Sequence, residues 1–192
     1  MTNAPLVRIL AIDPGLTGAL ACLAFDPHTR QLVDPPAVLD MPVVSTKVGP
    51  KTRNDILEAG LVEAVRQMRP TIAYVERVQP MRGEGAVGAF KFGAGWGLVR
   101  GVLAGMQVPT RLVTPQSWKK RAGLPTGASK DMSRQLASRL YPQLGAMFLR
   151  KKDDGRAEAV ILAHIMAQEH LAGPQDTVPQ KTRKTIPIMD AV

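Results

Sequence analysis

The stretch LAIDPGLTGALACLAF, residues 10–25, constrains the fold more than any other part of this 192-residue chain. An apolar run from Val7 to Ile12 leads into Asp13, and a Pro-Gly turn leads into a second apolar run, Gly18 to Phe25. Two short apolar runs around a tight turn predict a buried β-hairpin. The pattern therefore places a carboxylate at the end of a strand that must be buried.

Asp13 has two interpretations. Asp-Pro-Gly is ordinary turn chemistry, so a turn role is the simpler one. In the other interpretation, the apolar run holds the carboxylate rigidly at a strand end. Gly15 and Gly18 would then leave room beside it for a metal ion and a phosphate. The remaining acids of the chain decide between the two.

Composition bounds the class of protein. With 45% apolar residues and no run of 18 of them, the sequence predicts a soluble globular domain without a membrane-spanning helix. The N-terminus lacks the pattern of a signal peptide, and the single cysteine, Cys22, excludes a disulfide framework and a multi-cysteine zinc site. We expect one domain over residues 1–172, a flexible tail over 173–192, and a cytoplasmic setting.

Hydrophobic periodicity predicts an α/β domain with a five-stranded mixed β-sheet flanked by α-helices. A helix is expected from Asn54, as N-cap, to Met68, and others near 86–106, Thr114, Ser129 and Asp153. The expected strands are Val7–Ile12, Gly18–Phe25, Val38–Val44, Thr71–Val78 and Arg111–Thr114.

Positive charge is concentrated in one segment. Between Arg111 and Lys152 there are ten basic residues and one acid, so this segment accounts for the whole net charge of +9. Such a concentration indicates a polyanionic partner, although a solubilising surface is the alternative. The candidates for phosphate contact in this segment are Lys119, Lys120, Lys130, Arg134, Lys151 and Lys152.

A glycine motif between a predicted strand and helix matches a dinucleotide fingerprint but lacks its context. Gly83 to Gly88 reads G-x-G-x-x-G, and such a site also needs an acid about twenty residues later to hold the ribose. No acid lies between Glu84 and Asp131. We therefore expect no bound organic cofactor.

Carboxylates occupy unexpected positions in two further elements. Glu76 lies in the predicted strand TIAYVERV, where glutamate is disfavoured unless it has a partner. In the last helix, Asp154 and Glu158 are one turn apart and continue the stripe formed by Ile161 and Ile165. Two acids on a half-buried face are costly unless a cation lies between them.

Together, Asp13, Glu76, Asp154 and Glu158 form a candidate set of oxygen-only ligands. Such sets suit Mg²⁺ or Mn²⁺ better than zinc, which normally recruits His or Cys. Two such ions about 4 Å apart activate water and stabilise the leaving oxygen of a phosphodiester. With the basic segment as the complement of a phosphate backbone, the sequence favours a metal-dependent nuclease.

With these residues identified, the chain resembles the RuvC family of Holliday-junction resolvases, within the RNase H-like superfamily, and its phage and organelle-type branch most. The matching pieces occur in the family's order over roughly residues 7–171. They are IDPGLTGAL, YVERV, FKFGAGWGLVRGVLAGM, VTPQSWKK and DDGRAEAVILA.

The resemblance implies roles for individual residues. Asp13 matches the metal-binding aspartate of the first strand, Glu76 the second acid, and Glu158 the terminal acid. Asp154 matches the preceding ligand, with Asp153 as the alternative. Lys119 and Lys130 match lysines that the family uses near scissile phosphates. The expected cofactors are two Mg²⁺ or Mn²⁺ ions in each active site.

The resemblance also implies a homodimer that introduces symmetric nicks into a four-way DNA junction. The glycine-rich helix could form part of a dimer contact or pack within the chain. Its aromatic residues could stack on unpaired bases or belong to the core; they are Phe90, Phe92 and Trp96. Other readings are a nuclease for other branched DNA or RNA–DNA hybrids, a catalytically silent DNA-binding module, and an actin-like ATPase.

Overall fold

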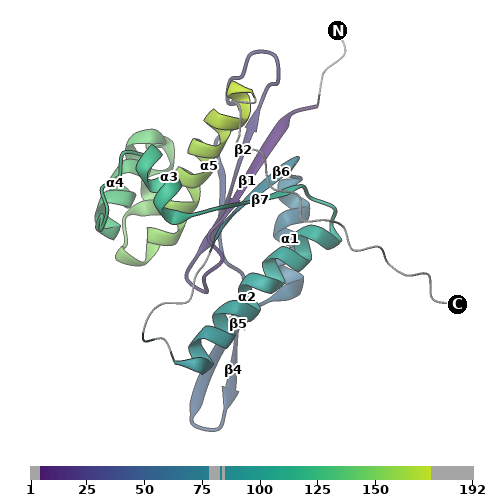
Figure 1. The fold of residues 1–192 in the computed structure, drawn as a ribbon, viewed down its shortest axis with the longest axis vertical. Coiled ribbons are helices and arrows are strands. Elements are labelled where there is room, and N and C mark those ends of the chain that lie inside the picture. Colours follow the sequence, from purple (N-terminus) through teal and green to yellow (C-terminus); the bar gives the residue numbers. More distant parts are fainter. Residues whose placement is uncertain (1–4, 78–82, 84, 174–192) are drawn as a thin grey trace, which may run out of the picture.

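The computed structural model describes residues 5–77, 83 and 85–173, and it contains a five-stranded mixed sheet in the order β3-β2-β1-β6-β7 (Figure 1). β1 pairs antiparallel with β2 and parallel with β6, and β6 pairs parallel with β7. The strands of this sheet are β1 (Val7–Ile12), β2 (Ala19–Phe25), β3 (Ala37–Asp40), β6 (Ile72–Glu76) and β7 (Thr110–Val113).

Helices cover both faces of the sheet, which gives the domain two apolar clusters. One face packs against α3, α4 and α5, and the other against α1 and α2 (Figure 1). The helices are α1 (Glu58–Met68), α2 (Ala86–Gly105), α3 (Pro115–Arg121), α4 (Lys130–Leu140) and α5 (Asp154–Ala172), with two 3₁₀ helices, η1 (Pro142–Phe148) and η2 (Lys151–Asp153). The predicted five-stranded sheet and all five predicted helices are confirmed.

The first two strands are almost wholly apolar because helices cover both faces of the sheet. Side chains alternate between faces, so Ile9 and Ala11 enter the cluster under α5, while Leu10 and Ile12 enter the cluster under α1 and α2. All four are fully buried. The predicted hairpin forms, and the backbone N–H of Asp13 donates to the carbonyl of Ala19 at 3.0 Å.

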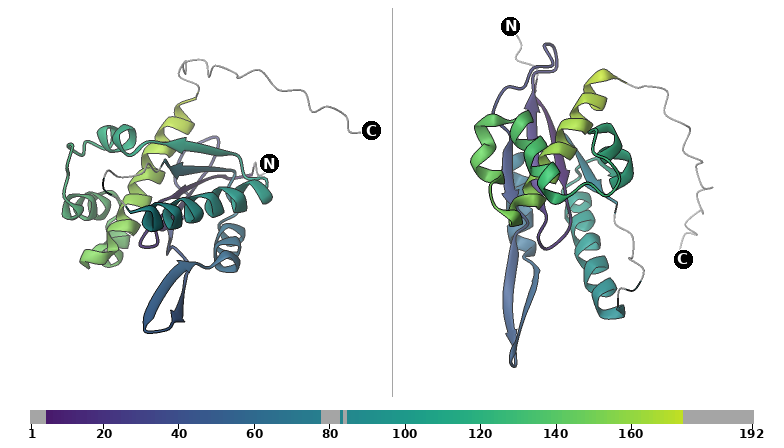
Figure 2. Two further views of the ribbon diagram at one scale, coloured as in Figure 1. Left: turned by 60° about the horizontal axis from the view of Figure 1, so that its bottom comes forward. Right: turned by 90° about the vertical axis from the view of Figure 1, so that its left-hand side faces the viewer.

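The segment after β3 differs from the prediction. One strand was expected over Val38–Val44, but the chain turns after Asp40 and forms a separate two-stranded sheet, β4 (Val43–Val48) and β5 (Lys51–Ile56). This hairpin projects away from the main sheet (Figure 2). The predicted helix start at Asn54 is therefore wrong.

Asn54 lies in β5, where its side chain accepts a hydrogen bond from the Ser45 hydroxyl at 2.7 Å, and α1 begins at Glu58. The cross-strand pairing of β4 and β5 outweighed the local capping preference of Asn54, since it satisfies the backbone of both strands.

Within the described residues, no helix is long and apolar enough to span a membrane. The domain boundary after residue 172 is an expectation that the described fold does not test. The expected flexible tail, residues 173–192, lies almost wholly outside the described part of the chain.

Candidate active site

Asp13 and Glu76 lie at adjacent ends of two parallel strands. β1 and β6 run side by side with Ile12 opposite Val75, and each acid is the next residue of its own chain segment. Because parallel strands end at the same edge of a sheet, the register brings the two carboxylates together. Burial, and after it the negative charge of Asp13, raises the pKa of Glu76.

Both acids point to the same face of the sheet, the one that α5 covers. Ile9 and Ala11 precede Asp13 on this face, and Ile72 and Tyr74 precede Glu76, in the period-two alternation of a strand. The apolar face therefore ends in two carboxylates. The strands hold them at the rim of the core, where both are partly buried.

Helix α5 brings two more acids to this rim. Asp154 begins the helix and Glu158 follows one turn later, with side-chain exposures of 15% and 19%. Both contribute to the charge that raises the pKa of Asp13. The four acids predicted from the sequence thus lie at the same rim, at the ends of β1 and β6 and at the start of α5.

Helix α5 approaches the β1–β2 turn closely because Gly155 has no side chain. A Cβ atom built at this position would lie 2.2 Å from the carbonyl oxygen of Thr17 and 3.0 Å from the Cα of Gly18. Only glycine permits this approach, which sets the distance between the acids of α5 and Asp13.

The two glycines of the turn differ from the expectation that both leave room for ligands. A Cβ at Gly18 would lie 2.2 Å from the carbonyl oxygen of Asp13, so Gly18 is needed for the hairpin itself. Gly15 instead contacts the carboxylate: its backbone N–H donates to Asp13 Oδ1 at 3.2 Å. The turn interpretation and the site interpretation of Asp13 are therefore compatible.

Burial and the charge of neighbouring acids raise the pKa values of the two strand acids. The pKa of Asp13 is raised to about 6, first by burial and also by the charge of Glu158, against the hydrogen bond from Gly15. The pKa of Glu76 is raised to about 7, first by burial and then by the charge of Asp13. Carboxylates with such values need a cation to stay ionised at low cost.

Lysine side chains pair with the two acids of α5. Lys119 of α3 donates to Glu158 at 2.8 Å, and Lys130 at the start of α4 forms an ion pair with Asp154. The Ser133 hydroxyl also donates to Glu158, at 3.3 Å. The two lysines that the resemblance singled out therefore lie directly beside the acids.

The structure separates Asp153 from Asp154. The Asp153 side chain is 2% exposed and accepts from Arg150 at 2.7 Å, which holds the pKa of this carboxyl below its usual range. Arg156 lies 3.8 Å from Asp153 and pairs with Asp40 of β3. Asp153 thus belongs to a network that fixes the start of α5, whereas Asp154 pairs with Lys130 and lies near Asp13.

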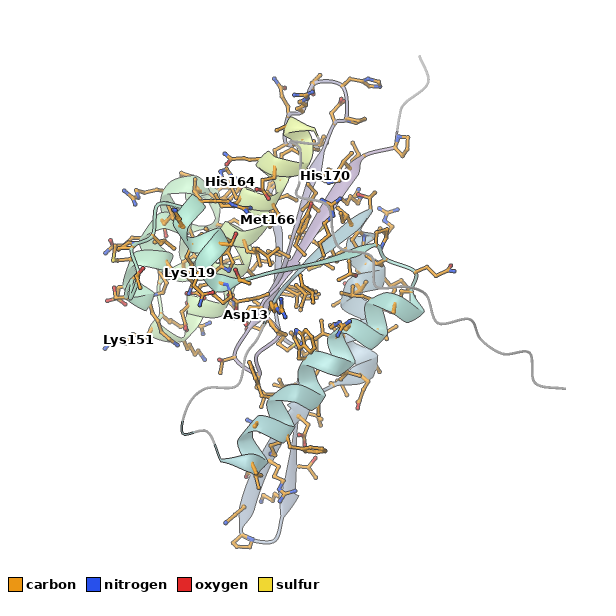
Figure 3. The ribbon with its side chains drawn as sticks, in the orientation of Figure 1. Asp13, Lys119, Lys151, His164, Met166 and His170 are labelled. Carbon is orange, nitrogen blue, oxygen red and sulfur yellow. The ribbon has the colours of Figure 1, made fainter. Side chains whose placement is uncertain are left out.

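The other predicted phosphate contacts divide into two groups. Lys120, Lys151 and Lys152 are exposed, and Lys151 points away from the domain (Figure 3). The guanidinium of Arg134 donates instead to the backbone carbonyl oxygen of Leu149 at 2.8 Å and pairs with Asp131. These bonds hold the segment after α4 to the helix and engage the Arg134 guanidinium.

Comparisons with known proteins agree with this geometry. No family model matches the chain. It is 31% identical over 113 residues to the chloroplastic Holliday junction resolvase MOC1 of Chlamydomonas reinhardtii, a match that covers 56% of this chain and 13% of that much longer protein.

Two solved structures from Thermus thermophilus match over most of their length. RuvC in complex with a Holliday junction substrate matches with a TM-score of 0.56 and 16% identity, over 87% of this chain and 96% of that one. Another T. thermophilus RuvC structure matches with a TM-score of 0.52 and 16% identity, over 87% and 97%. The chain has the RuvC fold. The predicted fold, a five-stranded mixed sheet flanked by helices, is confirmed, and the chain is similar in fold to RuvC.

The structure also places beside the acids a residue that the sequence analysis did not select. Trp118 of α3 is 1% exposed, and its indole Nε1–H donates to Glu76 Oε1 at 2.9 Å. Its signal in the sequence was its place one residue before Lys119, but its partner became visible only with the register of β6 and β7.

The ligand atoms that the four acids offer are of the type that the predicted divalent ions prefer. All four acids offer oxygen ligands only, which is what Mg²⁺ and Mn²⁺ prefer, and a cation would relieve the repulsion at Asp13 and Glu76. As they lie, no three acidic, histidine or cysteine side chains of the described residues close around a single point. The ammonium groups of Lys119 and Lys130 provide the positive charge beside α5.

We expect the metal-free protein to lose stability between about pH 4 and pH 7. The folded-state pKa values of Asp13 and Glu76 lie above those of the unfolded chain, so the native state binds more protons and is penalised as both acids ionise. Glu76→Gln removes one of these charges. In chelator, this variant is expected to be more stable than the wild type by about 3 kcal/mol at pH 8.

Denaturant unfolding at several pH values measures this difference. The advantage of Glu76→Gln should shrink toward pH 5, where Glu76 is largely protonated. A difference that does not change with pH would contradict the raised pKa.

Proposed function

We propose that this protein is a metal-dependent nuclease that resolves four-way DNA junctions by paired symmetric nicks. The supporting observation is the convergence of Asp13, Glu76, Asp154 and Glu158 on one rim of a RuvC fold, beside two lysines. The curated relative named as a junction resolvase strengthens the proposal.

The four acids would hold the divalent ions. Bound Mg²⁺ or Mn²⁺ would activate a water for attack on the phosphodiester and stabilise the leaving oxygen. Asp13 and Glu76 are held rigidly, because Asp13 follows directly on the buried strand β1 and Glu76 is the last residue of the buried strand β6. We propose two ions per site, in line with the number of acids.

The basic residues around the acids would contact the phosphates. Lys119 and Lys130 already reach the acids, so they lie close to where a scissile phosphate would be held. The exposed side chains of Lys120, Lys151 and Lys152 extend the positive surface. Each phosphate that they neutralise adds a salt-dependent contribution to affinity.

A homodimer would place two such sites on one junction. Helix α2 has surface for a second copy: Gly93, Gly97 and Gly101 have no atoms near their Cβ positions, whereas Gly95 packs on Ile56 of β5. Phe90 is 77% exposed, and Trp96 is partly buried against the core. The cellular compartment stays a prediction.

Cleavage of matched substrates tests the proposal. With Mg²⁺ or Mn²⁺, the purified protein should cut a synthetic four-way junction at symmetric positions at least about tenfold faster than a linear duplex of the same sequence. Equal cutting of both would overturn junction specificity and favour a general nuclease of this fold. Junction binding without cutting in either metal would favour a silent DNA-binding module.

A further inference from the structure

Helix α3 reaches two of the four acids through consecutive residues. It follows β7 directly, and β7 pairs with β6 so that Val113 lies opposite Glu76. Thr114 caps the helix by accepting a hydrogen bond from the Ser117 backbone N–H, and Pro115 occupies its first turn. The start of α3 is therefore fixed beside the end of β6, where Glu76 lies.

The two contacts of α3 go to different elements. Trp118 donates to Glu76 of β6 at 2.9 Å, and the next residue, Lys119, donates to Glu158 of α5 at 2.8 Å. The Lys119 ammonium also lies 5.1 Å from the centre of the Trp118 ring. One short helix thus links the strand acids to the helix acids.

Burial restricts the motion of the Trp118 side chain. It is 1% exposed and belongs to the apolar cluster between the sheet and α5. An indole has one hydrogen-bond donor and no acceptor. The buried Nε1–H of Trp118 therefore needs an acceptor, and Glu76 Oε1 is that acceptor. A buried ring thereby fixes the rotation of a carboxylate that would otherwise turn about its last bond.

We propose that Trp118 is a positioning residue for the metal site. Its indole N–H holds one oxygen of Glu76 and leaves the other for a divalent ion, so the acid needs no reorientation when the ion binds. This role rests on the proposed function. Partners that orient metal ligands in this way typically contribute tenfold to a hundredfold in metal affinity or activity.

Trp118→Phe tests the role because it keeps a buried aromatic ring and removes only the donor and part of the ring. We expect it to weaken Mn²⁺ binding by about tenfold in titration calorimetry, and to raise the Mn²⁺ concentration for half-maximal cleavage by a similar factor. Phe148→Leu is the matched control. Phe148 is 2% exposed in the same cluster, so this change should lower stability without changing Mn²⁺ affinity.

A second measurement does not depend on the Trp118 variant folding. The chain has two tryptophans, so Trp96→Phe leaves Trp118 as the only one. Because its indole binds a carboxylate of the site, saturating Mn²⁺ should quench its fluorescence. Absence of quenching despite Mn²⁺ binding would overturn the placement of Trp118.

The outcomes distinguish the two proposals. Wild-type protein that binds Mn²⁺ and cuts junctions, with Trp118→Phe unchanged in Mn²⁺ affinity, would overturn the positioning role alone. Equal loss of affinity in Trp118→Phe and Phe148→Leu would also overturn it, since a general loss of packing would explain both. Failure of the wild-type protein to bind Mn²⁺ or to cut would overturn the proposed function and the positioning role together.

Discussion

Asp13→Asn is expected to reduce junction cleavage on the order of a thousandfold and to leave junction binding almost unchanged. The change keeps the size of the side chain and its acceptor for the Gly15 backbone N–H, but it removes the negative charge that would hold a metal ion. Binding should persist because, in the proposed function, the phosphate contacts would come from lysines on α3, α4 and η2. Cleavage rates in Mg²⁺ and junction affinity by gel shift, measured on one preparation, check both parts.

Asp34→Asn is the matched control. Asp34 is exposed and lies in the connection between β2 and β3, at the end of the sheet opposite to Asp13, because β2 runs antiparallel to β1. It should cut like the wild type. Normal cutting by Asp13→Asn would remove Asp13 from the site, and would leave the simple turn interpretation.

The convergence of the acids was within reach of the sequence because each acid followed a strong local pattern. Asp13 ended an apolar run, Glu76 interrupted a strand, and Glu158 lay on the core-facing stripe of a helix. The strand register then brings Asp13 and Glu76 together, since Ile12 pairs with Val75. The choice between Asp153 and Asp154 needed the structure, because helical position alone does not show that Arg150 binds Asp153.

Features that depend on contacts between distant segments could not be read from the sequence. The β4–β5 hairpin pairs polar residues such as Ser45 and Asn54, and its pattern lacks the apolar alternation of a half-buried strand. The partner of Trp118 depends on how β7 pairs with β6. Gly155 looked like any glycine in a helix, and only its distance from Thr17 shows why it is there.

Gly155→Ala is expected to impair both folding and cleavage. The added methyl group would overlap the carbonyl oxygen of Thr17, so α5 must move away from the β1–β2 turn. We expect a loss of about 2 kcal/mol or more in the free energy of unfolding. Since Asp154 and Glu158 move with the helix, cleavage should fall on the order of a hundredfold, the usual consequence of misplacing reacting groups by about 1 Å.

The same substitution elsewhere in the fold isolates the cause. Gly145→Ala also replaces a glycine in a helical segment, η1, but nothing lies within 4 Å of its Cβ position, so it should raise stability by about 0.5–1 kcal/mol through the unfolded state. Chemical denaturation and junction cleavage of the two variants give the comparison. If Gly155→Ala gained stability as Gly145→Ala does and cut normally, the close approach of α5 to the turn would not set the geometry of the acids. A loss of stability and cleavage in Gly155→Ala alone would show that the position of Glu158 depends on the absence of a side chain at Gly155.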